Sequence, residues 1–188
     1  MKKLLLAFAF VAIFVSAQSQ VSLKYGVKAG LNVSNFTGDV DNAKSLTGGQ
    51  FGVFARFSVL GKLALQPELL YSMQGAKNDG EDGDVKYKNN YIQIPVMVKF
   101  YPLLGLNIQA GPQVGFLASS KIDGEDAKDS MKKMDFAFNV GAGYDTSFGL
   151  GIDARYSIGL TNVLDSNEMF DDVEAKNGVF SVAVSYCF

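Results

Sequence analysis

The chain contains no histidine and no tryptophan, and its 188 residues include a single cysteine, Cys187. Histidine is the commonest metal ligand in proteins and the usual general base near neutral pH. Its absence excludes Ser-His-Asp and Cys-His nucleophile systems as well as histidine-ligated zinc. One cysteine cannot form an internal disulfide. The sequence therefore argues against an enzyme and indicates no cofactor or metal centre.

A long apolar run is missing as well. A helix needs roughly 20 apolar residues to cross a bilayer, and the longest apolar stretch, residues 4–15, is too short. It follows Lys2 and Lys3 and ends at the small residues Ser16 and Ala17, which is the layout of a secretory signal peptide. We expect a signal peptide over residues 1–20 and one domain over residues 21–188, with an uncleaved N-terminal anchor as the alternative.

What the chain has in abundance is alternation of apolar and polar residues. Because successive side chains of a strand point to opposite faces, an alternating stretch forms a strand with one apolar and one polar face. Eight such stretches are present, each close to the ten residues that a tilted strand needs to cross hydrocarbon: residues 25–34, 49–59, 63–74, 90–101, 106–118, 134–145, 150–160 and 179–188.

The connections between these stretches alternate in length. Residues 60–62, 102–105 and 146–149 form short turns, whereas residues 35–48, 75–89, 119–133 and 161–178 form long loops. This layout predicts an all-β, eight-stranded, antiparallel up-and-down transmembrane β-barrel, with both termini on the short-turn side. Pro67, Pro95 and Pro112 fall inside expected strands. Since proline removes a ladder donor, we expect bulges or gaps in pairing there.

The distribution of charge indicates which face meets lipid. The apolar faces are nearly free of charge, whereas the polar faces carry amides, glycines and ionic residues. A lysine or arginine facing lipid at the bilayer midplane costs roughly 2–4 kcal/mol. We therefore expect the polar faces to line a lumen in which Glu68 and Asp153 offset the four basic residues: the predicted lumen network is Lys28, Arg56, Glu68, Lys99, Asp153 and Arg155.

Larger side chains on the polar faces are expected to help fill the lumen, since eight strands leave an interior just wide enough for side chains. They are Phe54, Leu70, Tyr91, Met97, Tyr101 and Leu117. Two alternatives remain open at this point. One is a narrow pore; the other is a soluble lipocalin-like binding barrel, which would place its apolar face inside.

Several strings in the chain resemble strands of one known family. They are Leu65-Gln66-Pro67-Glu68-Leu69-Leu70-Tyr71-Ser72, Tyr91-Ile92-Gln93-Ile94-Pro95-Val96 with Lys99-Phe100-Tyr101-Pro102, Gln109-Ala110-Gly111-Pro112-Gln113-Val114-Gly115, and Asp153-Ala154-Arg155-Tyr156-Ser157-Ile158-Gly159-Leu160-Thr161-Asn162. In order, they resemble the third, fourth, fifth and seventh strands of PorT-like outer-membrane barrel domains of Bacteroidetes, which share the OmpA/OmpX-like eight-stranded architecture.

The resemblance implies a place in the cell outer membrane, with periplasmic termini and extracellular long loops, rather than an activity. The tail also resembles the C-terminal signal read by the barrel-assembly machinery, which Val184, Tyr186 and Phe188 would carry. The implied partners are thus outer-membrane lipid and, during insertion, that machinery. Membrane enzymes such as lipid A deacylases or omptin-like proteases would need a histidine, as resemblance to those families implies.

The net charge of −2, from 17 basic and 19 acidic residues, gives no reason to expect nucleic acid as a partner. Most of the carboxylates fall in the long loops, for instance in Asp79-Gly80-Glu81-Asp82-Gly83-Asp84. Divalent cations are possible ligands of such loops, with solvated surface charge as the alternative. The leading hypothesis is a non-enzymatic outer-membrane barrel with a plugged lumen and a structural or loop-mediated interaction role.

Overall fold

The computed structural model describes residues 21–38, 43–59, 61–80, 83–122, 125–126, 133–161 and 175–188. Its strands are β1 (Val21–Gly38), β2 (Ala43–Val59), β3 (Leu63–Gly80), β4 (Gly83–Phe100), β5 (Leu106–Ile122), β6 (Glu125–Asp126), β7 (Met134–Asp145), β8 (Leu150–Gly159) and β9 (Ala175–Cys187). In the described residues, no helix is long and apolar enough to cross a membrane.

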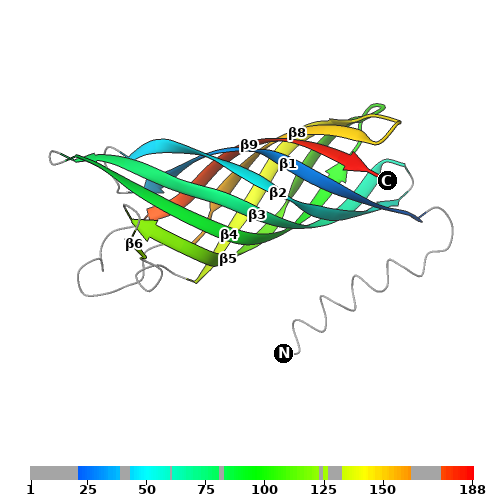
Figure 1. Cartoon of the computed structure of the whole chain (residues 1–188). Coiled ribbons are helices and arrows are strands. Elements are labelled where there is room, and N and C mark those ends of the chain that lie inside the picture. The colour runs from blue at the N-terminus through cyan, green and yellow to red at the C-terminus, as the bar shows by residue number, and fades with distance from the viewer. Residues whose placement is uncertain are drawn as a thin grey trace.

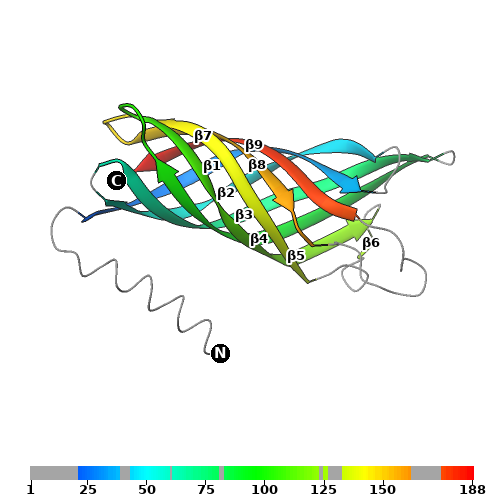
Figure 2. The same cartoon turned by 180° about the vertical axis from the view of Figure 1, so that it is seen from behind.

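The strands form one closed antiparallel barrel, which Figures 1 and 2 show from opposite sides. Their order is β4-β3-β2-β1-β9-β8-β7-β5-β6, and a further pairing of β4 with β5 closes the ring. The two-residue β6 extends the β5 edge, so eight long strands make the wall. The expectation of an eight-stranded antiparallel barrel is confirmed.

The first five strands are longer than the alternation predicts. β1 to β5 have 17 or 18 residues each, whereas β7, β8 and β9 have 12, 10 and 13. Residues 35–38, 43–48, 75–80, 83–89 and 119–122, which the sequence assigned to loops, continue these strands. In these extensions the alternation of apolar and polar residues fades, but backbone pairing persists up to Gly80 opposite Gly83. Hydropathy marks only the part of each strand that crosses an apolar layer.

Three tight turns connect strands at one end of the barrel, and each contains a glycine with positive φ. The φ angles are 67° at Gly61, 78° at Gly105 and 97° at Gly149. L-residues with side chains rarely adopt this conformation, which explains glycine at these positions. The C-terminus lies at the same end, where the Phe188 backbone N–H donates to the Tyr25 carbonyl at 2.7 Å. This end is called the turn end below, and the opposite one the loop end.

The prolines interrupt pairing without shifting it. The ladder between β2 and β3 skips Pro67, the one between β3 and β4 skips Pro95, and the one between β4 and β5 skips Pro112. The register is the same on both sides of each gap. Register shifts occur elsewhere, between Ser45 and Gln50 in β2 and between Asn90 and Tyr91 in β4. The expected gaps are therefore present, and the bulges lie away from the prolines.

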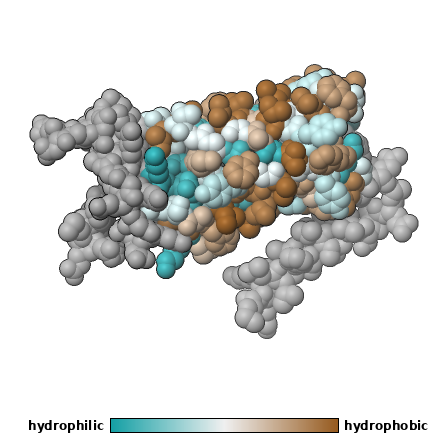
Figure 3. Space-filling model, viewed as in Figure 1, coloured by the Kyte–Doolittle hydropathy of each residue, from teal (hydrophilic) through white to brown (hydrophobic). Residues whose placement is uncertain are grey.

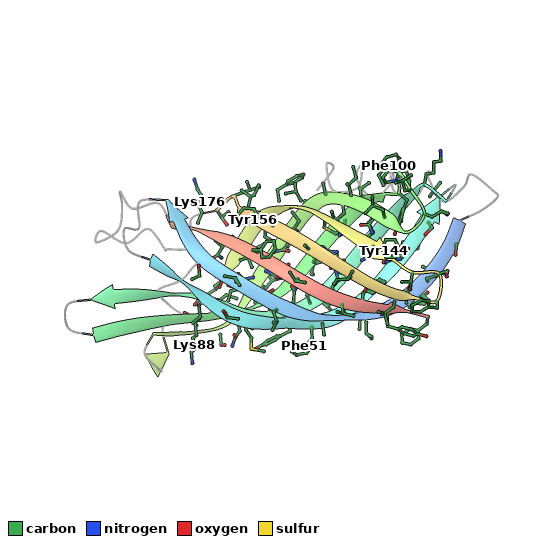
Figure 4. The ribbon with its side chains drawn as sticks, turned by 90° about the horizontal axis from the view of Figure 1, so that it is seen from above. Phe51, Lys88, Phe100, Tyr144, Tyr156 and Lys176 are labelled. Carbon is green, nitrogen blue, oxygen red and sulfur yellow. The ribbon has the colours of Figure 1, made fainter. Side chains whose placement is uncertain are left out.

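The barrel is apolar outside and polar inside. Outward side chains are well exposed, for example Leu31 at 65% and Phe51 at 54%, whereas Lys99 is 1% exposed. Figure 3 shows hydrophobic residues spread along the described wall, and Figure 4 shows Phe51, Phe100, Tyr144 and Tyr156 on its outer face. This arrangement is the reverse of the lipocalin-like alternative, which needs an apolar interior.

Candidate functional site in the lumen

Seven ionic side chains from six strands meet inside the turn-end half of the barrel. We call them the ionic layer: Lys28 of β1, Arg56 of β2, Glu68 of β3, Lys99 of β4, Asp145 of β7, and Asp153 and Arg155 of β8. Each alternates along its strand with outward apolar neighbours, so the period of two turns it into the lumen. Six of the seven are less than 9% exposed, and the Asp145 side chain is 14% exposed.

Glu68 is the centre of this layer. Both of its oxygens accept from the Arg155 guanidinium, Oε2 from Nη1 at 2.7 Å and Oε1 from Nη2 at 2.6 Å. Such a two-pronged pair combines charge with fixed geometry. The Gln66 amide also donates to Oε1 at 2.7 Å, and the Lys28 Nζ lies 3.4 Å away. One carboxylate thus joins β3 to β8 and β1 across the lumen.

Asp153 completes the cluster around Glu68. Its Oδ2 lies 2.9 Å from the Lys28 Nζ, and its Oδ1 lies 3.0 Å from the Arg155 Nε. Lys28 and Arg155 therefore each contact two carboxylates, and Glu68 and Asp153 each contact two cations. Closed sets of this kind offset the desolvation of buried charges, which an isolated charge cannot do.

Asp145 organises a second cluster closer to the turn end. Its Oδ1 accepts from the Arg56 Nη2 at 3.0 Å, and its Oδ2 lies 3.2 Å from the Lys99 Nζ. Oδ2 also accepts from the Tyr101 hydroxyl at 2.8 Å and from the Asn107 amide at 3.0 Å. Tyr101 lies in the turn after β4, where burial raises the pKa of its hydroxyl and keeps it protonated as a donor.

The two clusters are joined through Gln66. Arg56 stands directly across from Gln66 in the extended register of β2 and β3, and its Nε donates to the Gln66 Oε1 at 2.7 Å. The Gln66 amide in turn donates to Glu68. Arg56 and Glu68, on neighbouring strands, are therefore bridged by an amide and not by a direct contact.

The sequence prediction for the lumen network missed Asp145. It assigned Glu68 and Asp153 to offset all four basic residues, whereas Arg56 and Lys99 contact Asp145 instead. Asp145 is the last residue of β7, beside a turn, and the sequence prediction therefore left it out of the lumen. The signal was available, because Asp145 follows the outward Tyr144 and must therefore point inward.

The loop-end half of the lumen is built mainly from neutral groups. One carboxylate, Asp135 of β7, is buried there as well, where it accepts from the Thr161 hydroxyl at 2.7 Å and from the Asn177 amide at 2.9 Å; the predicted lumen network did not include it. We call the neutral set the amide layer: Asn32, Ser72, Gln74, Asn89, Gln113, Ser120, Asn139 and Ser157. Its hydrogen bonds include Asn32 to Ser72 at 2.8 Å, Ser120 to Asn89 at 2.8 Å and Asn139 to Gln113 at 3.1 Å. The Ser157 hydroxyl also donates to Asn139.

The larger side chains expected in the lumen lie there. Phe54, Leu70, Tyr91, Met97 and Leu117 are at most 6% exposed, and Tyr101 is partly exposed at the turn end. Some buried amide atoms have no partner among the described residues, including both polar atoms of Gln109 and the Oδ1 of Asn107. Buried polar atoms without protein partners are where structural water is usually found.

The remaining predicted sites are the C-terminal residues and the acidic loops, and the structure describes only the first of these in full. Val184, Tyr186 and Phe188 lie on the outer face at 51%, 44% and 71% exposure, and the Tyr186 and Phe188 rings meet edge to face with centroids 5.3 Å apart. The described residues hold no group of three or more side chains that could bind a metal ion. The acidic loop clusters lie largely outside the described residues, and their side chains wholly so.

Comparison with known proteins agrees with this architecture. A family model for the outer membrane protein beta-barrel domain matches residues 17–165. Neisserial surface protein A has 13% identity and a TM-score of 0.63 over 89% of this chain and 99% of its own. Ail, the attachment invasion locus protein of Yersinia pestis, solved with the heparin analogue sucrose octasulfate, has 15% identity and a TM-score of 0.51, with the same coverage. At these identities the two structures show a shared fold alone. No curated protein gave a significant match.

Proposed function

The chain belongs to the outer membrane protein β-barrel domain family, and on that premise we propose that it is a non-enzymatic structural barrel whose lumen stays closed and whose loops meet partners. Its place is the outer membrane. The proposal rests on one observation above all: the ionic layer crosses the lumen from β1, β2, β3 and β4 to β7 and β8. A permeating ion would have to separate pairs at 2.6–3.2 Å that are shielded from water.

The orientation and export of the barrel are part of the proposal. Short turns on the periplasmic side and longer loops outside are usual for outer-membrane barrels. The shared position of the glycine turns and the C-terminus supports a periplasmic turn end. Export by residues 1–20 as a signal peptide, and recognition of Val184, Tyr186 and Phe188 by the barrel-assembly machinery, fit this orientation. Assignment to the PorT-like group of Bacteroidetes rests on the strand motifs.

Planar-bilayer recording tests the closed lumen. The refolded chain should give no steady current, and folding should be checked by the change in gel mobility between unheated and boiled samples. Steady single-channel currents from the unmodified chain would contradict the proposal.

A narrow pore is the second candidate, and the unpaired amide atoms of Gln109, Asn107, Asn32 and Gln74 favour it. These atoms lie on both sides of the Glu68 cluster, and buried polar atoms without a protein partner usually bind water. Replacing Glu68 with alanine should open a current if the ionic layer is the barrier. No current from a folded Glu68→Ala variant would indicate that the bulky lumen residues also close the path.

The loop end is the proposed contact site for partners. Divalent cations at the acidic loops stay a prediction, because the side chains concerned lie outside the described residues. Calcium titration monitored by proteolysis of the loops in the intact barrel would test it, with a protected pattern expected if the ions bind.

A further inference from the structure

The turns at the turn end of the barrel differ in composition. Residues 102–105, between β4 and β5, read Pro-Leu-Leu-Gly, and residues 146–149, between β7 and β8, read Thr-Ser-Phe-Gly. Neither turn contains a charged residue. The turn between β2 and β3, by contrast, places the exposed Lys62 directly after Gly61. Two of the turns therefore carry large apolar side chains without any charge beside them.

The apolar side chains of these two turns project away from the barrel. Leu104 is 98% exposed, Phe148 is 69% exposed and Leu103 is 68% exposed. These fractions exceed those of the neighbouring wall residues Leu106 and Leu150, at 41% and 43%. A single exposed apolar residue is ordinary, but several of them together mark a surface that meets lipid or another protein.

The two turns are neighbours in space. Strands β5 and β7 are paired, and the Asp145 backbone N–H donates to the Gly105 carbonyl at 2.7 Å. There is no room for a side chain at Gly105, because its Cβ would lie 2.8 Å from the Tyr144 ring. Figures 1 and 2 show both turns, in green and yellow, at one corner of the turn end. We call Leu103, Leu104 and Phe148 the apolar corner.

The apolar corner continues the lipid-facing wall. The register places the outward Leu106 opposite the outward Tyr144, directly below the two turns. On β5 the apolar outer face runs from Leu106 to Phe116, which is close to the roughly 9–11 residues that a tilted strand needs to cross hydrocarbon. The apolar corner therefore lies at the edge of the hydrocarbon, where the headgroup layer begins.

The polar groups of the turn between β7 and β8 are largely paired within the turn. The backbone N–H and the hydroxyl of Thr146 both donate to the Leu150 carbonyl, at 2.7 Å and 2.8 Å. The Gly149 N–H donates to the Thr146 carbonyl at 3.3 Å. Asp145, just before the turn, contacts Arg56 and Lys99 on the lumen side. Moving this turn out of water therefore leaves none of these groups without a partner.

We propose that the apolar corner inserts into the leaflet at the turn end, where its three side chains contact acyl chains below the headgroups. The occupant is lipid because the corner is continuous with the lipid-facing wall and carries no charged side chain. Insertion seats this corner of the barrel deeper than the corner at Lys62. The inference rests on the barrel's place in the membrane and not on a closed lumen. Under the orientation proposed above, the leaflet is the inner one.

The absence of tryptophan from the chain allows a direct test. Three variants of the full chain each introduce one tryptophan: Leu104→Trp and Phe148→Trp in the apolar corner, and Lys62→Trp in the turn between β2 and β3 as the matched control. Each is refolded into phosphatidylcholine vesicles, and folding is checked by gel mobility before and after boiling. Tryptophan emission is then quenched from the lipid by phosphatidylcholine brominated near the headgroup end of its chains, and from water by acrylamide.

The tryptophans at positions 104 and 148 should emit at shorter wavelength than the one at position 62. Brominated lipid should quench them severalfold more, and acrylamide severalfold less. Tryptophan itself favours the membrane interface, but all three variants share that preference, so the difference between them reports the depth of each turn.

Two outcomes would overturn the proposal. Acrylamide quenching at position 104 or 148 that equals the quenching at position 62 would place that turn in water, where a soluble protein would be the partner of the corner. Lipid quenching at position 62 as strong as in the apolar corner would show that neither side of the barrel is seated deeper. Steady currents through the lumen would refute the closed barrel and leave this result unchanged.

Discussion

The two halves of the lumen differ in the chemistry by which their buried polar side chains find partners. Near the turn end, four cations and three carboxylates are buried in two linked clusters. Near the loop end, amides and hydroxyls such as Asn32, Ser72 and Asn139 bond one another, and the one carboxylate described there, Asp135, has neutral donors as its hydrogen-bond partners. Both halves fill a barrel interior with polar groups, but they differ in how strongly the stability of the barrel depends on each residue.

The difference follows from desolvation. A buried charge that loses its partner keeps the full cost of leaving water, whereas an amide that loses one bond loses far less. The ionic layer should therefore fix the register of the strands, since sliding one strand would separate several pairs at once. The amide layer should tolerate substitution. The predictions below test this contrast in order of expected effect.

The largest effect is expected at Glu68. Glu68→Gln preserves the side-chain volume but leaves Lys28 and Arg155 buried with reduced compensation. The free energy of unfolding should fall by about 3–5 kcal/mol. Because the chain has no tryptophan, the folded fraction should be followed by unheated gel mobility against urea in lipid vesicles.

The matched control is Ser72→Ala, four residues further along β3 and in the amide layer. It should cost about 1 kcal/mol. Equal losses for the two variants would remove the proposed distinction between the layers. A double-mutant cycle of Glu68→Gln with Arg155→Gln should give a coupling energy of about 1–3 kcal/mol.

A smaller loss is expected at Asp145, because this carboxylate lies nearer the lumen mouth. Asp145→Asn weakens the contacts with Arg56 and Lys99 but keeps the side-chain shape. With 14% of the side chain exposed, water can replace part of what is lost. The expected loss is about 1.5–3 kcal/mol, measured by the same urea titration. High salt should lower the stability of the unmodified barrel less than this substitution does.

The sequence was sufficient to predict which side chains of each strand face the lumen. It was not sufficient to predict which of them contact one another there. Each lumen charge alternates with apolar neighbours, so the period of two alone turns Lys28, Arg56 and Lys99 inward. Arg155 and Glu68, by contrast, are 87 residues apart in sequence. Their contact depends on how the closed ring staggers its strands, which no local pattern records.

Strand length was underestimated for a related reason. The alternation marks where one face meets an apolar layer, and it fades once both faces meet water. Pairing of β3 with β4 nevertheless continues through Lys77 and Lys86 to Gly80 and Gly83, held by backbone hydrogen bonds. The cross-strand pairing in this extension was hidden in what the sequence indicated to be loops.

An effect as small as that of Ser72→Ala is expected at Ser120, whose hydroxyl donates to the Asn89 Oδ1 at 2.8 Å in the amide layer. Ser120→Ala removes one neutral hydrogen bond between β4 and β5. The Asn89 Oδ1 loses its donor and can accept from a neighbouring amide or from water instead. The free energy of unfolding should therefore fall by about 1 kcal/mol. The shift of the urea midpoint, multiplied by the slope of the titration, gives this value. An unchanged slope would show that the barrel unfolds from the same closed state. A loss as large as that of Glu68→Gln would mean that neutral bonds secure the register as firmly as ion pairs, and that burial rather than charge decides which lumen residues hold the wall together.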